Sequence, residues 1–583
     1  MVHRCLLVPE LFSLVCDVLR HDCKMRLRQR SATLASLALT CRAFEGPALD
    51  VLWREIDGLR PLLCTMPSDL FEMKAKDWSR QVHILCLRRP ILLSDLTRLP
   101  SYAQRIRKLR VDSTPSVDIG ALQALGMATL HMRPLLPNLE DLMWGYGYLA
   151  KEVEWSMFQC IYLFFSPKLT RLSVFLSNIF DHACPPSILS GLINSCPALK
   201  ELTFYIQSSN SDEENRRGIS SAICQWNCLQ SLTVNGLTQE ALEHLATIPS
   251  LQTLSLNSLQ DVTRADNQHL PIVTRIPTSG YPALQSLSIS CRTINAVIAF
   301  VQLLSSSPLE DLEIQVGDLC YLRQWRELFS SISRHICHPS LEALTLQESG
   351  NALEPPEALI SDIGLEALSV FTNLQTVDIQ PAFGIQLTSD TVNRLADAWP
   401  NIRSLELGNM SPWPRSSIIK TEDLIPFAQR CSKLSYLGIV FDAQNTQLRL
   451  SPGFFNNNLT SLSVADSPIN APPKVAAFLS DIFPRIESIT FADDWRDSTD
   501  GDPENATETA RMWDEAECLL ETFAMSRTNK DNNFGDLFES PVRSGFLMPR
   551  GVNRNRNRSA FSPEVKRPDR TAKRPQTAVF CGL

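Results

Sequence analysis

Leu199-Lys-Glu-Leu202-Thr-Phe204 and Leu229-Gln-Ser-Leu232-Thr-Val234 are two copies of one short phrase, with apolar residues at the first, fourth and sixth positions. Fifteen such phrases occur within residues 82–491, at an average spacing of about 29 residues. The other thirteen begin at Val82, Ile106, Leu139, Leu169, Leu251, Leu284, Leu309, Leu341, Leu374, Ile402, Leu434, Leu459 and Ile486. The chain is therefore organised by an internal repeat.

Each phrase predicts a β-strand with one buried face, because its last two apolar residues lie two positions apart with a polar residue between them. The segments between phrases have helical periodicity, as in residues 238–246 and 421–431. Cys196-Pro197 and Trp399-Pro400 stand where a helix must end before the next strand. The repeating unit is predicted to be one strand and one helix, stacked so that the strands run parallel.

This pattern resembles the leucine-rich repeat family, in its longer and irregular form. The resemblance implies an α/β solenoid with parallel strands on one face and helices on the other. Regular members of that family carry an Asn or Cys after the strand, whereas this chain has Leu237, Arg292 and Met410 at such positions. An even curvature is therefore not expected.

The first 57 residues differ from the repeats. A helical stripe of apolar residues includes Leu11, Leu14, Val15 and Val18, and a second stripe follows over residues 34–44. A third short helix is predicted over residues 47–56. Three short helices bury little apolar area by themselves, so the segment is expected to need a partner.

The residue order of this segment resembles an F-box: Val8-Pro9-Glu10-Leu11, then residues 34–44 ending in Cys41-Arg-Ala-Phe44, then Leu52-Trp53. The resemblance implies docking on a Skp-type adaptor and, through it, a cullin, as part of an SCF-type ubiquitin ligase. The positions that it implies for adaptor contact are Pro9, Glu10, Leu11, Val15, Leu34, Leu37, Leu39, Cys41, Arg42, Phe44, Leu52 and Trp53. The alternative is that these helices only cap the open end of the solenoid.

A substrate protein would bind the concave face of the solenoid, where the polar residue between the last two apolar positions of each phrase points. Acids gather on this face at Asp311, Glu313, Asp378 and Glu406. One hypothesis is that they bind a basic segment of a substrate. The other is that such residues simply suit a solvated strand face, and this second interpretation is favoured.

The expected organisation is an F-box-like helical domain at 1–57, a linker at 58–81, the solenoid at 82–493, an acidic segment with a capping helix at 494–527 and a basic disordered tail at 528–583. The capping helix is expected over about residues 508–526. Residues 541–583 carry a local charge of +8. Three interpretations of this tail are open: nuclear targeting, loose nucleic-acid contact or, by default, a solvated tail that pairs with the acidic segment.

Composition and motifs narrow the function classes. A net charge of −8 with a pI near 5.7 argues against nucleic-acid binding by the chain as a whole. The apolar runs are too short to cross a membrane, and seventeen scattered cysteines indicate reduced thiols in the cytoplasm or nucleus. No nucleotide, zinc or hydrolase motif occurs, so we expect no metal, no cofactor and no catalytic residue. The sequence predicts a substrate-recognition subunit of an SCF-type ligase, with a non-ligase interaction scaffold as the alternative.

Overall fold

The computed structural model describes residues 8–23, 26–76, 79–111, 117–145, 151–180, 184–208, 212–259, 280–304, 307–349, 363–409, 418–447, 456–491 and 508–533. The chain divides into two compact units, Met1–Thr528 and Asn529–Leu583. All but the last five of the described residues belong to the first unit. The predicted acidic stretch before residue 508 and the basic tail after residue 533 lie outside the described residues.

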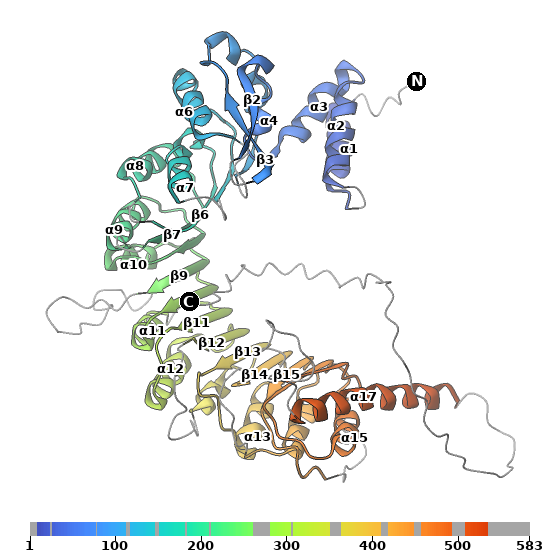
Figure 1. Cartoon of the computed structure of the whole chain (residues 1–583). Helices are drawn as coiled ribbons and strands as arrows, with labels where there is room; N and C mark the ends of the chain where they lie inside the picture. The colour runs from blue at the N-terminus through green and yellow to red at the C-terminus, as the bar shows by residue number, and fades with distance from the viewer. Residues whose placement is uncertain are drawn as a thin grey trace. The chain divides into compact units, whose positions relative to one another are not determined.

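The main feature is a parallel sheet of fifteen strands (Figure 1), with β1 followed by β4 and then by every strand in chain order. The strands are β1 (Glu55–Asp57), β4 (Lys108–Val111), β5 (Asp141–Gly145), β6 (Arg171–Phe180), β7 (Glu201–Ser208), β8 (Ser231–Val234), β9 (Thr253–Leu259), β10 (Ser286–Cys291), β11 (Asp311–Val316), β12 (Ala343–Glu348), β13 (Thr376–Gln380), β14 (Ser404–Leu407), β15 (Tyr436–Ile439), β16 (Ser461–Ala465) and β17 (Ser488–Phe491). Parallel neighbours need a crossover, and most of the crossovers here contain a helix.

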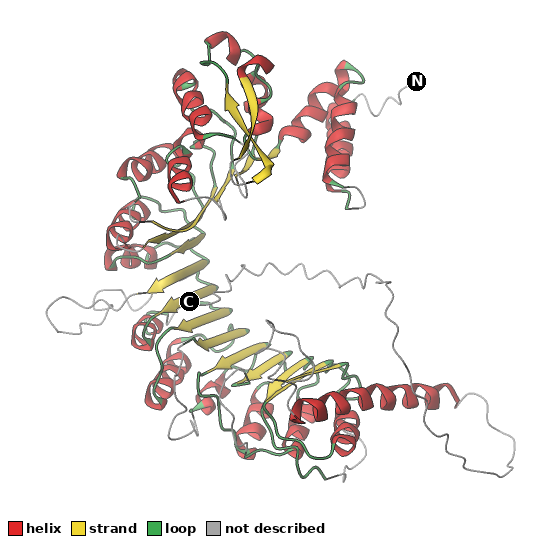
Figure 2. Ribbon diagram, in the orientation of Figure 1, coloured by secondary structure: helices red, strands yellow, loops and turns green. Residues whose placement is uncertain are grey.

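The crossover helices lie along one side of the sheet (Figure 2). They are α5 (Leu99–Ala103), α6 (Ile119–Ala128), α7 (Lys151–Phe158), α8 (Pro186–Ser195), α9 (Asp212–Ile223), α10 (Gln239–Ala246), α11 (Ile294–Val301), α12 (Leu322–His335), α13 (Ser389–Ala398), α14 (Ile425–Arg430) and α15 (Pro472–Ile482). The 3-10 turns η3 (Leu93–Leu96), η4 (Leu130–Met132), η5 (Ile161–Phe164), η6 (Leu365–Val370) and η7 (Thr421–Leu424) accompany or replace helices. The predicted α/β solenoid of stacked strand and helix units is confirmed.

The core is formed by the apolar positions of the repeated phrase, which stack in register from strand to strand. Leu254 pairs with Leu287, Leu287 with Leu312, and Leu312 with Leu344. All four side chains are completely buried. Because alternate strand residues point to opposite faces, the polar residues between them lie on the other face of the sheet.

Three helices precede the sheet and have a small core of their own: α1 (Pro9–His21), α2 (Leu27–Ala38) and α3 (Arg42–Trp53). The rings of Phe12 and Phe44 stack with centroids 3.9 Å apart. The remaining buried residues of this core are Cys16, Leu34, Ala38, Ala48 and Val51. We refer to α1–α3 as the three-helix unit.

The boundary between helices and repeats differs from the expected one. The sheet begins at β1, before the predicted linker at 58–81, and this segment is itself folded into α4 (Arg60–Leu63), η2 (Ser68–Leu70) and β2 (Phe71–Lys76). The first phrase lies in β3 (Ser79–Leu87), which pairs antiparallel with β2 and not with the parallel sheet. The physical reason is that β1 already occupies the place beside β4.

A helix covers the other end of the sheet, where the sequence predicts one over about residues 508–526. This helix is α17 (Glu508–Asn533), and its Trp513 is buried. Trp513 Nε1 donates to the Ser467 carbonyl at 2.9 Å, and the indole packs edge-on against Phe441. Glu517 Oε1 accepts from the amide of Ile489 in the last strand at 3.1 Å, so a side chain occupies part of the sheet edge.

Candidate functional site

Helix α1 carries apolar residues on two faces. One face packs Phe12 and Cys16 into the core of the three-helix unit. The other face, together with Val8 just before the helix, leaves five aliphatic side chains exposed, with 61% of Leu14 and 71% of Val18 accessible to solvent. We call this set, which consists of Val8, Leu11, Leu14, Val15 and Val18, the α1 stripe. A single exposed leucine needs no explanation, but a continuous apolar helix face indicates a binding surface.

The residues after α2 add to the exposed surface of the three-helix unit. Leu39 is 88% exposed directly after the last turn of α2. Cys41 and Arg42, at the start of α3, are exposed as well. The structure therefore leaves seven of the twelve predicted adaptor positions open to solvent: Pro9, Glu10, Leu11, Val15, Leu39, Cys41 and Arg42.

The other five predicted positions are engaged inside the protein. Leu34 and Phe44 are buried in the core of the three-helix unit, and Leu37 and Leu52 are half-buried against it. Trp53 packs against the core of the repeats, with its ring 4.7 Å from that of Tyr102. In this structure Leu34 and Phe44 stabilise the helices and offer no surface to a partner.

Sequence reasoning did not include the exposed Val8, Leu14 and Val18 among the predicted adaptor positions, although Leu14 and Val18 belong to the predicted helical stripe. The signal was their spacing, because residues three and four apart share a helix face. With apolar residues on both faces of α1, the sequence alone does not tell which face turns inward.

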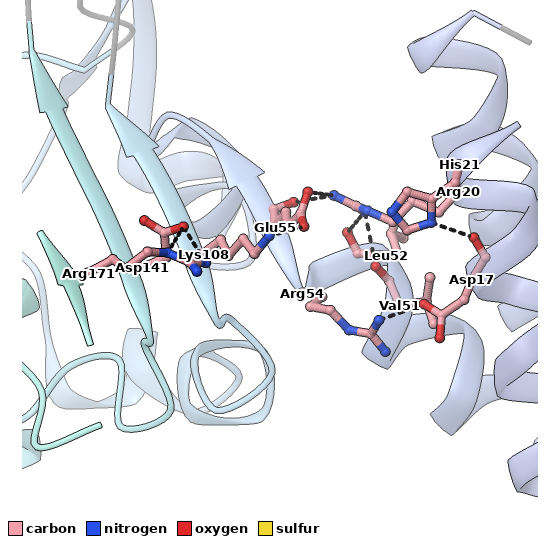
Figure 3. A network of polar contacts seen from close by, with 10 residues as sticks. All are labelled: Asp17, Arg20, His21, Val51, Leu52, Arg54, Glu55, Lys108, Asp141 and Arg171. Atoms are coloured by element: carbon pink, nitrogen blue, oxygen red, sulfur yellow. Dashed lines mark hydrogen bonds and ion pairs between the residues drawn. The ribbon is translucent and has the colours of Figure 1, made fainter. Parts of the chain in front are cut away.

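Polar contacts connect the three-helix unit to the start of the sheet (Figure 3). The Arg20 guanidinium donates to the carbonyls of Val51 at 3.0 Å and Glu55 at 3.2 Å, and it lies 3.3 Å from Glu55 Oε2. Glu55 Oε1 lies 3.1 Å from Lys108 Nζ in the neighbouring strand. Partial burial opposes ionisation of Glu55, but the hydrogen bond from Lys108 and the charge of Arg20 lower its pKa.

The predicted acidic residues also come together, on the face of the sheet opposite the helices. Strand pairing places Glu313 beside Thr345, Thr345 beside Asp378, and Asp378 beside Glu406. Asp311 lies on the same face of β11 as Glu313, two residues earlier. We call Asp311, Glu313, Asp378 and Glu406 the acidic surface.

All four carboxylates of the acidic surface accept hydrogen bonds from neutral donors. Asp378 accepts from Nε2 of Gln347 and of Gln380, both at 2.8 Å, and Glu406 accepts from Nδ2 of Asn409 at 3.4 Å. The hydroxyl of Ser288 donates to Glu313 at 3.1 Å, and the hydroxyl of Ser286 donates to Asp311 at 3.4 Å. Burial and the nearby charge of Glu313 raise the pKa of Asp311, and the hydrogen bond from Ser286 offsets only part of this rise. Like charges held side by side attract cations, so this surface suits a basic partner.

The described residues contain no group of three His, Cys, Asp or Glu side chains arranged to hold a metal ion. Within the same part of the chain, every helix is too short or too polar to cross a bilayer.

No family model and no curated protein matches this sequence. Matches among solved structures include a leucine-rich repeat protein of Leptospira interrogans, at 15% identity and a TM-score of 0.38 over 75% of this chain and 88% of that one. The TLR13–ssRNA13 complex matches at 15% identity and a TM-score of 0.33, over 68% of this chain and 52% of that one. The yeast Rad7 and Elc1 complex matches at 13% identity and a TM-score of 0.32, over 86% of this chain and 93% of that one.

At such low identity and TM-score these likenesses do not identify a function, which has to be inferred from the residues of this chain. The fold follows from the chain itself, because leucine-rich phrases stack in register into one parallel sheet with helices along one side. The chain folds as a leucine-rich repeat solenoid that begins with three helices.

Proposed function

We propose that this chain is the substrate-recognition subunit of an SCF-type cullin–RING ubiquitin ligase. In this proposal the α1 stripe, together with Leu39 and Cys41, docks a Skp-type adaptor, and the adaptor connects the chain to a cullin. The observation that carries the proposal is the α1 stripe, a row of exposed aliphatic side chains on a helix whose other face is already packed. Covering apolar surface gains about 25 cal/mol per Å², so such a row favours a protein partner.

The proposed role is non-catalytic. The solenoid holds a substrate protein, and the ligase gains rate because a substrate lysine is kept at high effective concentration near the charged conjugating enzyme. No cofactor is needed for this task. The site of action would be the cytoplasm, the nucleus or both.

The acidic surface is the proposed binding site for the substrate. It combines carboxylates on three of four neighbouring strands, which lie about 4.8 Å apart. An extended basic segment has charges at a comparable spacing. The substrate is therefore proposed to present lysines or arginines to β11–β14.

Co-purification of the full chain with a Skp-type adaptor tests the proposal. The informative variant is Leu14→Asp with Val18→Asp, because these side chains are exposed and their replacement does not disturb the core. The matched control is Leu92→Asp with Leu93→Asp, since these leucines are 58% and 71% exposed on a different element. We expect stoichiometric capture by the wild type and the control, and at least about tenfold weaker capture by the α1 variant.

A non-ligase scaffold, in which the three helices only cap the solenoid, is the second candidate. It is favoured by the packing of Trp53 against Tyr102, which joins the helices to the repeats. A folded wild-type chain that captures no Skp-type adaptor would make this the leading function. Equal capture by the α1 variant would remove the α1 stripe from the proposed interface.

A further inference from the structure

Arg20, in the last turn of α1, completes the end of another helix. Helix α3 ends at Trp53, and the last carbonyls of a helix have no partner within it. The Arg20 guanidinium donates to two of them, Val51 at 3.0 Å and Leu52 at 3.3 Å. A cation at a helix C-terminus is also favoured by the helix dipole. Only 15% of the Arg20 side chain is exposed, so these hydrogen bonds are largely shielded from water.

The same guanidinium reaches the first strand of the sheet. It donates to the carbonyl and to the carboxylate of Glu55, which is the first residue of β1. The Glu55 carboxylate continues to Lys108 of β4 at 3.1 Å (Figure 3). Between α3 and β1, the carbonyl of Arg54 accepts from the amides of Arg107 and Lys108, both at 2.9 Å. One side chain of α1 thus belongs to a continuous polar network that reaches β4.

A second contact from α1 runs beside the first. Asp17 lies three residues before Arg20, and its carboxylate is 2.6 Å from Arg54 Nη1. The side chains of Asp17 and Arg20 therefore hold Arg54, which joins α3 to β1, and Glu55, the first residue of β1. Val18, a member of the α1 stripe, lies between them in the sequence.

We propose that Arg20 is a positioning residue that makes α1 and the first two strands of the sheet one cooperative unit. A partner that binds the α1 stripe would then stabilise β1 and β4 as well, because a ligand stabilises every element that must be folded for it to bind. The part of this inference that concerns the adaptor rests on the function proposed above. The part that concerns the free chain does not.

Hydrogen exchange of the full chain, followed by mass spectrometry, tests both parts. In the free chain, Arg20→Gln is expected to speed exchange of the amides in residues 106–111 about tenfold, the effect of losing one or two charge-assisted hydrogen bonds. Arg20→Lys keeps the charge without the forked donor and should have an intermediate effect. The control is Arg217→Gln, which removes an exposed ion pair with Glu213 on α9. This control should leave residues 106–111 unchanged.

Adding a purified Skp-type adaptor gives the second readout. With the wild type, protection should increase in α1 and also in residues 54–58 and 106–111. With Arg20→Gln, the adaptor should still protect α1 from exchange, but residues 106–111 should gain no protection. An effect of Arg20→Gln confined to α1–α3 in the free chain would overturn the inference, whether or not the adaptor binds. If Arg20→Gln speeds exchange of residues 106–111 in the free chain but the wild type binds no adaptor, the inference is supported and the proposed function is rejected.

Discussion

The side-chain amide of Asn409 donates to the hydroxyl of Ser463 at 3.1 Å, so a residue that follows β14 reaches β16 across the strand between them. The crossing point is Gly438 of β15, which pairs in register with Glu406 on one side and Ser463 on the other. A side chain at this position would collide with the bridge. A Cβ atom built on Gly438 would lie 2.5 Å from Asn409 Nδ2.

Gly438→Ala is therefore expected to destabilise the chain by about 1–3 kcal/mol, because Asn409 must give up buried hydrogen bonds to Ser463 and Gln380. Urea unfolding of the two chains measures the change. Gly46→Ala is the matched control, since a Cβ there meets nothing within 4 Å and the residue lies within α3. The control should be neutral or slightly stabilising, as expected for glycine to alanine in a helix. Equal stability of Gly438→Ala and wild type would contradict the bridge.

Phe44→Asp is expected to unfold the three-helix unit. Its ring stacks on Phe12 in the core of that unit, and burial of an unpaired carboxylate there adds to the loss of packing, which alone is about 3–5 kcal/mol. Protease cleavage within residues 8–53 measures the unfolding. Leu14→Asp with Val18→Asp should resist the protease like the wild type. If both variants are cleaved equally, adaptor capture will not separate a contact residue from a core residue.

Asp311→Asn is expected to raise the melting temperature at neutral pH. Burial and the charge of Glu313 raise the pKa of Asp311 in the folded chain, so its ionised form opposes folding. The favourable contribution of the protonated group is present below the unfolded pKa of about 3.9 and is lost as the pH rises through the folded value. The difference between Asp311→Asn and wild type should therefore shrink on acidification. A lower melting temperature of the variant at pH 7 would show that the carboxylate stabilises the fold.

Asp95 should make an opposite contribution to the pH dependence. The hydrogen bond from Arg89, and then the backbone amide of Leu92, lower the pKa of Asp95 to about 2. The stabilisation is therefore present above the unfolded pKa of about 3.9 and is lost as the pH falls through about 2. Asp95→Asn should unfold more readily at pH 5, with a smaller difference near pH 2. Glu310→Gln, at an exposed carboxylate, is the control, and an equal loss in both variants would contradict the role of Asp95.

Trp513→Ala is expected to release α17 from the last repeat. The loss of a buried tryptophan and of its hydrogen bond to Ser467 costs about 3–5 kcal/mol and uncovers β17, the last strand of the sheet. An uncovered strand edge pairs with other chains, so the variant should associate as its concentration rises. Sedimentation velocity at several concentrations measures this association. The control is Glu515→Ala, on the exposed face of α17, which should associate no more than the wild type. If Trp513→Ala also associates no more than the wild type, α17 does not protect the strand edge.

Much of the fold could be predicted because strands leave a period of two in the sequence. Leu312 and Leu344 mark their strands locally, and the polar residue after each one fixes which residues share a face. The alignment of Glu313, Asp378 and Glu406 follows from this register and was predicted. A phrase marks the position of a strand, but it does not indicate which other strands pair with it.

The start of the solenoid was predicted at residue 82, whereas the sheet begins at β1, because the phrases do not show which strands are neighbours. Strand β1 has only three residues, with Ile56 as its one buried side chain, and therefore carries no phrase to reveal it. The phrase in β3 is complete, but its partner is β2 in a separate antiparallel pair. The exposed surface of the three-helix unit was only partly predicted for a related reason, since both faces of α1 are apolar and the inward face is decided by packing against Phe44.

The direct passage from α3 into β1 has a consequence for protein engineering. Arg54 is the single residue between the last residue of α3 and the first of β1. Transplanting residues 1–57 onto another carrier would take β1 away with the helices. Residues 108–110 of β4 would then lose their partners on one side and pair only with β5. The transplanted helices would carry an unpaired β1, and the remaining solenoid would lose its first strand. A graft that includes β4 would keep the pairing of β1 with β4.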